Sequence, residues 1–154
     1  MINGIAALRV AAKAAGLAPI SSISASSLVV DTRVRRVEAL VAAGRHDEAV
    51  TEGEELRVEI TGGGSDPLLW TALMRSMGEA WSAIGEVDRA LAALDDSVER
   101  AVAVGATYEE AESRRVRAEV LDRHGRPGAF EDRSRASEVF AGLAIVDRVS
   151  SPGR

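Results

Sequence analysis

Apolar residues recur every three or four positions along most of the chain, the spacing that places them on one face of an α-helix. Glycines separate these stripes, and glycine closes helix ends because it adopts a left-handed conformation that other side chains resist. The pattern predicts an all-α protein with seven helices. Their expected bounds are residues 4–16, 25–43, 46–61, 66–84, 87–104, 107–124 and 128–147.

The helix ends carry recognisable signals. Two glycine series mark the corners: Gly44, Gly85 and Gly125, which lie 41 and 40 residues apart, and Gly16, Gly62 and Gly105 between them. Asp66 before Pro67 predicts an N-cap followed by proline at the first helical position. Thr107, with Glu110 three residues later, predicts a capping box. The rhythm indicates helical hairpins that repeat about every forty residues.

The apolar stripes also predict the core. Trp81 lies in the stripe at residues 69–84 and is expected to be buried rather than to stack on a ligand. Trp70 lies in the same stripe and is also expected to be a core residue. Val102, Tyr108 and Leu143 are expected on the buried faces of later helices. The hairpin at residues 66–104 has the most regular stripes and should be the most stable.

Residues 70–104 resemble a tetratricopeptide repeat. Met77-Gly78 stands where that family has leucine-glycine, Trp81 stands at its tyrosine position, and its glycine, alanine and bulky apolar positions are filled by Gly85, Ala90 and Leu94. Residues 107–143 resemble the longer, forty-residue form. The first hairpin departs from the pattern, with Val37 at the glycine position and Leu40 at the tyrosine position.

The resemblance implies one domain at residues 1–149, built as a right-handed stack of antiparallel hairpins, an α-solenoid. Residues 4–16 would cap the stack, hairpins would occupy residues 25–61, 66–104 and 107–147, and residues 150–154 would form a disordered tail. Repeats of this kind occur in bacterial signalling regulators, behind ATPase or cyclase modules. An exposed terminal helix would also offer a surface for a homodimer.

Members of this family bind partners on the concave surface that the first helix of each hairpin lines. Carried over position by position, the groove residues are Asp31, Glu38, Arg75, Glu79, Ser82, Glu112, Arg115, Glu119 and Asp122. This mainly acidic set favours a basic or amphipathic peptide. The alternative is that these charges form a solvated helix face and pair locally at spacings of three and four.

Composition narrows the classes of function. Nineteen basic residues against 24 acidic ones give a formal charge of −5, the wrong sign for nucleic-acid binding. Cysteine is absent, and no apolar run approaches the roughly 18 residues of a membrane span. Arg9 and Lys13 are the only charges in the first thirty residues, which suits either a transit peptide or a small packed helix; we expect the helix. These features predict a cytoplasmic protein.

Candidate chemistry is sparse. Residues 62–65 are glycine-rich but lack the lysine of a phosphate-binding loop, and the only histidines, His46 and His124, are expected to be surface or capping residues. We therefore expect no catalytic residue, metal or cofactor. The sequence favours a non-catalytic protein-binding scaffold or regulatory sensor module. The alternative is an effector or small-molecule-binding domain of a bacterial signalling or transcriptional regulator.

Overall fold

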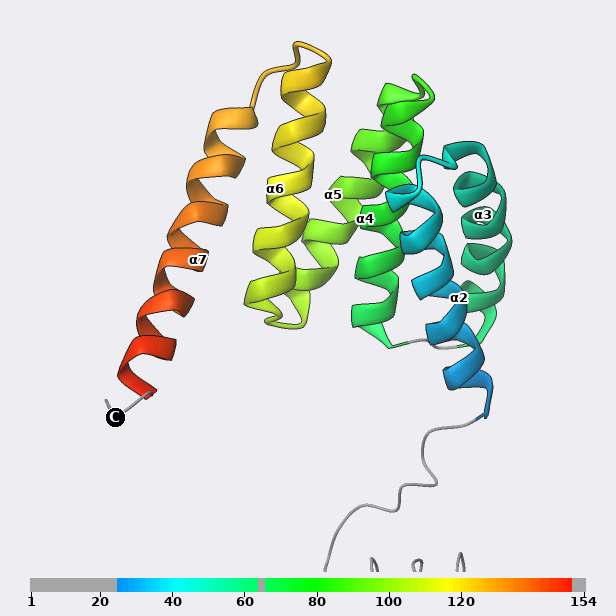
Figure 1. Cartoon of the computed structure of the whole chain (residues 1–154), viewed down its shortest axis with the longest axis horizontal. Helices are drawn as coiled ribbons and strands as arrows, with labels where there is room; N and C mark the ends of the chain where they lie inside the picture. The colour runs from blue at the N-terminus through cyan, green and yellow to red at the C-terminus, as the bar shows by residue number, and fades with distance from the viewer. Residues whose placement is uncertain (1–24, 64–65, 151–154) are drawn as a thin grey trace, which may run out of the picture.

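A computed structural model describes residues 25–63 and 66–150 of the 154-residue chain. Every regular element within these ranges is an α-helix (Figure 1). The helices are α2 (Ala25–Ala42), α3 (His46–Gly63), α4 (Pro67–Ala83), α5 (Val87–Ala103), α6 (Thr107–Arg123) and α7 (Ala129–Ser150). The all-α prediction is confirmed for this part of the chain, and the predicted helix at residues 4–16 lies outside it. At the C-terminal end, α7 runs three residues past its expected end.

Consecutive helices pack against one another along the chain, and α4 and α5 share the most extensive interface. In addition α2 contacts α4, and α4 contacts α6 (Figure 1). The first helices of the three hairpins therefore lie side by side. Among the described helices α7 packs on α6 alone.

Four corners are closed by glycine. At the end of α4, Gly85 has φ of 88° and donates its N–H to the Ser82 carbonyl, while the Glu86 N–H bonds to the Trp81 carbonyl at 2.9 Å. This pair of bonds satisfies two carbonyls that the helix end would otherwise leave free. The same pattern recurs at Gly44, Gly105 and Gly125. Gly62 does not end its helix, because α3 continues to Gly63.

Only one of the two predicted N-caps is present. The Asp66 Oδ1 accepts the Leu68 N–H at 2.9 Å, which confirms the cap of α4. The capping box at Thr107 is wrong. Ala106 occupies the cap position without a side-chain bond, because the chain passes straight from the glycine corner into α6 and Thr107 is already helical. The Glu110 carboxylate instead accepts the Arg114 Nε–H at 2.8 Å.

The buried core draws its residues from α2, α3, α4, α5 and α6. Leu56, Leu73, Met77 and Leu94 are fully buried, and Trp81 is 5% exposed, as the stripes predict. Trp70 is half-buried at the edge of this cluster. Its indole N–H donates to Asp96 Oδ2 at 2.5 Å.

Glycine inside a helix sets the spacing of α4 and α5. A Cβ atom at Gly78 would lie 2.5 Å from Cγ of the fully buried Leu94, so the absence of a side chain lets the two helices approach closely. Gly53 serves the same purpose in α3, against Met77 of α4.

Several residues expected in the core are exposed. Val102 and Tyr108 are 52% and 53% exposed, and Ile84 and Leu143 are each 39% exposed. Ile84 is the C-cap of α4 and Val102 lies in the last turn of α5, beyond the cover of the neighbouring helices. Tyr108 packs edge-on against Phe140 of α7, with ring centroids 5.9 Å apart, instead of entering the interior.

Candidate functional site

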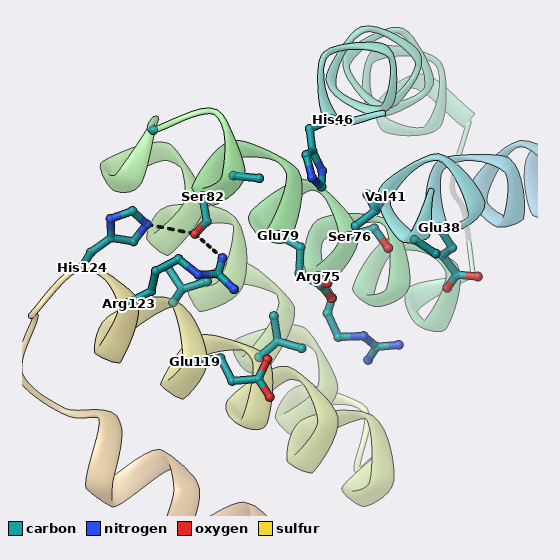
Figure 2. Close-up of a pocket in the computed structure, with 15 residues that line it drawn as sticks. Glu38, Val41, His46, Arg75, Ser76, Glu79, Ser82, Glu119, Arg123 and His124 are labelled. Atoms are coloured by element: carbon teal, nitrogen blue, oxygen red, sulfur yellow. Dashed lines mark hydrogen bonds between the residues drawn. The ribbon is translucent and has the colours of Figure 1, made fainter. Parts of the chain in front are cut away.

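A groove of about 800 Å³ runs across α2, α4 and α6 and reaches the corners that follow them (Figure 2). Small and β-branched side chains such as Ser76, Ala83 and Val116 leave the space open. The lining residues are Glu38, Val41, Ala42, His46, Arg75, Ser76, Glu79, Ser82, Ala83, Gly85, Val116, Glu119, Val120, Arg123 and His124.

The predicted groove residues separate into two groups. Those that line the groove are Glu38, Arg75, Glu79, Ser82 and Glu119, and those that do not are Asp31, Glu112, Arg115 and Asp122. Asp122 pairs with Arg133 of α7, so it faces the opposite side of α6. Glu112 accepts hydrogen bonds from Arg115 along the surface of α6.

Three of the groove charges have partners. Glu38 pairs with Arg35 at 2.9 Å, and Glu119 pairs with Arg115 at 2.6 Å, each within its own helix. Glu38 and Glu119 thus form local ion pairs at spacings of three and four residues. Arg75 reaches across to α6, where its Nη1 lies 2.6 Å from an oxygen of Glu109.

Glu79 is the exception. Within the described residues its carboxylate accepts no hydrogen bond and has no cation within ion-pair distance, although it is half-buried in the groove. Burial raises the pKa of this carboxyl above its ordinary value. Arg115, Arg75 and Arg123 oppose that rise, and the negative charge of Glu119 adds to it. The charged form of Glu79 is thus poorly compensated.

Replacing Glu79 by glutamine is expected to raise the melting temperature at pH 7 by a few degrees at most. The raised pKa means that the folded state holds the proton more tightly than the unfolded state does. When the pH is above the folded-state pKa of Glu79, ionisation of its carboxyl therefore lowers the stability of the fold. This cost disappears as the pH falls to the pKa that the same carboxyl has in the unfolded state. Thermal melts between pH 4 and pH 8 measure the effect.

The matched control is Glu99→Gln, an exposed glutamate that occupies the same position in α5 as Glu79 does in α4. The gain of Glu79→Gln over wild type should shrink as the pH falls toward 4, while Glu99→Gln should show no such trend. A loss of stability in Glu79→Gln at pH 7 would contradict the assignment of Glu79 as an uncompensated charge.

Both histidines line the groove at the ends of helices. The expectation of a capping histidine is confirmed for His124, which is the C-cap of α6. His46 opens α3, and its Nδ1 atom is buried without a hydrogen-bond partner in the described residues. His124 follows α6, and its Nε2 lies 3.0 Å from the Ser82 hydroxyl, which also accepts a bond from Arg123 Nη1 at 3.1 Å (Figure 2). The sequence does hold a signal for this position of the two histidines. They lie at the corners after α2 and α6, and the corners after α2, α4 and α6 must meet at one end of the molecule.

The contact between Ser82 and His124 resembles one element of nucleophilic catalysis. However, Ser82 is only 2% exposed, its oxygen also accepts the Arg123 bond, and no described carboxylate bonds to His124. The pair therefore lacks the access and the orienting acid of an activated serine. Nor does the described part of the chain gather three histidine or acidic side chains around a point where a metal ion could bind.

No protein-family model, curated protein or solved structure matches this chain. Of the helices that the structure describes, none is both long and apolar enough to cross a bilayer.

Proposed function

We propose that this chain is a tetratricopeptide-like module that binds a segment of a protein partner in the groove across α2, α4 and α6. It acts as a scaffold or regulatory sensor module, not as an enzyme, in the bacterial cytoplasm. In this proposal the hairpins form a right-handed solenoid, capped by the predicted helix at residues 4–16. The observation that carries the proposal is an open groove in which the Glu79 carboxylate has no bonding partner among the described residues.

The lining favours a polypeptide over a small effector molecule. A groove of about 800 Å³ would accommodate either, but small-molecule sites are mainly apolar with a few polar groups. Here seven of the fifteen lining residues are ionisable: Glu38, His46, Arg75, Glu79, Glu119, Arg123 and His124. Charged groups spread along three helices suit an extended segment with several polar contacts.

The one acid without a partner favours a basic segment. Of the three glutamates that line the groove, Glu38 and Glu119 pair with arginines outside the lining, whereas Glu79 has no ion-pair partner among the described residues. The net charge of −5 adds an attraction for positively charged partners at longer range. Such complementarity sets association rate and specificity more than affinity.

Blocking the groove with a tryptophan tests the proposal. Ala83 is an exposed groove residue at the end of α4, and Ala103 is its counterpart at the end of α5, outside the groove. Because both positions are exposed, Ala83→Trp and Ala103→Trp should fold equally well. Peptides are selected from a random dodecapeptide library against the wild type, and their affinities for the three proteins are measured by fluorescence anisotropy.

The selected peptides should bind Ala83→Trp about tenfold or more weakly than wild type, a loss of about 1.4 kcal/mol or more. Their affinity for Ala103→Trp should remain within about twofold of wild type. Equal losses in both variants, or no loss in Ala83→Trp, would place binding elsewhere and refute the proposal. Failure to select any peptide would refute it as well.

A further inference from the structure

Glu79 differs from the other acidic groove residues in its surroundings. Glu38 and Glu119 each have an arginine on their own helix, whereas no described cation lies within ion-pair distance of Glu79. A half-buried carboxylate without a partner costs folding free energy, which a purely structural position would avoid. Its place in the groove points to a partner outside the chain.

The arginines near Glu79 already bind other groups. Arg75 is held by Glu109 of α6, Arg115 by Glu112 and Glu119, and Arg123 by the Ser82 hydroxyl. None of them lies within ion-pair distance of Glu79. An incoming cation would therefore find this carboxylate without a bonded partner.

His46 does not supply a second acceptor to an incoming group. Figure 2 shows it entering from the start of α3, on the side of the groove where Glu79 projects from α4. Its unsatisfied Nδ1 atom is buried, so a group that enters the groove cannot reach that atom. Glu79 is therefore the acceptor that the groove offers to an incoming cation.

We propose that Glu79 receives an arginine side chain of the bound segment. This inference rests on the proposed function and names the residue that would select the partner. Arginine fits better than lysine because its planar head carries donors in a fixed fork that can bond both oxygens of one carboxylate. Glu38 and Glu119 contribute negative potential around the same point.

The test uses the full chain and three fluorescein-labelled dodecapeptides, in which alanine alternates with arginine, lysine or the neutral arginine analogue citrulline. The arginine peptide should bind wild type, and the lysine and citrulline peptides should bind more weakly. Glu79→Gln should weaken the arginine peptide about tenfold or more, as expected for the loss of a charge-assisted bond. The charge-matched control Glu99→Gln should change it less than about twofold.

The outcomes separate this inference from the proposed function. If the arginine peptide binds Glu79→Gln as tightly as wild type, or binds no better than the citrulline peptide, the inference is overturned. If in addition Ala83→Trp abolishes binding of the library-selected peptides, the groove still binds polypeptides and only the role of Glu79 is lost. If Ala83→Trp leaves those peptides unaffected, the proposed function itself fails.

Discussion

Trp81→Ala is expected to lower the free energy of unfolding by about 3–5 kcal/mol, the largest effect of any single change considered for the core. The indole is 5% exposed and belongs to the buried cluster that joins α2, α3, α4, α5 and α6. The guanidinium of Arg89 lies 4.5 Å from its ring centroid, which adds a cation–π contact on the outer side. Urea unfolding followed by circular dichroism measures the loss.

Trp81→Phe is the informative control. The indole Nε1 is buried without a hydrogen-bond partner in the described residues, so phenylalanine removes an unsatisfied donor while it keeps much of the apolar contact. The phenylalanine variant should therefore lose less than half as much stability as the alanine variant. A loss below about 1 kcal/mol for Trp81→Ala would contradict the core assignment and leave the ring free for a ligand.

Asp132→Ala is expected to cost about 3 kcal/mol. Asp132 is 3% exposed and accepts hydrogen bonds from Arg117 Nε and Nη2, at 2.6 and 2.7 Å, and from Arg114 Nη1 at 3.0 Å. Removing the carboxylate leaves two partly buried guanidinium groups without their shared partner. Arg114 keeps its ion pair with Glu110, and Arg117 keeps its ion pair with Asp95. The expected loss is therefore at the low end of the range for breaking a buried ion pair.

The matched control for Asp132 is Asp122→Ala. Asp122 also bridges α6 and α7, through Arg133, but both side chains are more than half exposed. Its removal should cost no more than about 0.5 kcal/mol, since exposed ion pairs contribute little. Equal losses in the two variants would show that burial of the Asp132 network does not stabilise the contact between α6 and α7.

The sequence predicted the described helices well because their ends depend on local chemistry. Glycine at positive φ, and aspartate before proline, act on the backbone within a few residues of themselves. The capping box at Thr107 failed because the preceding glycine corner determined where α6 begins. Exposure of Val102 and Tyr108 could not be predicted, since it depends on how far each neighbouring helix extends.

The groove was only partly predictable from the sequence. The resemblance to tetratricopeptide repeats predicted Glu38, Glu79 and Glu119 as groove residues, and all three line the groove. The resemblance does not reveal which of these acids finds an arginine, because that depends on the conformations of the side chains. The network at Asp132 was missed for the same reason, since its arginines lie 15 and 18 residues away on another helix.

The central claim is that the face shared by α2, α4 and α6 binds polypeptide. Nuclear magnetic resonance mapping tests it most directly, by titrating the isotope-labelled chain with a library-selected peptide and following every assigned amide. We predict the largest shifts at groove residues such as Ser76, Glu79 and Glu119, with α5 and α7 nearly unchanged. The largest shifts at the exposed contact between Tyr108 and Phe140 would instead show that the peptide binds the far end of the molecule, and would contradict the account.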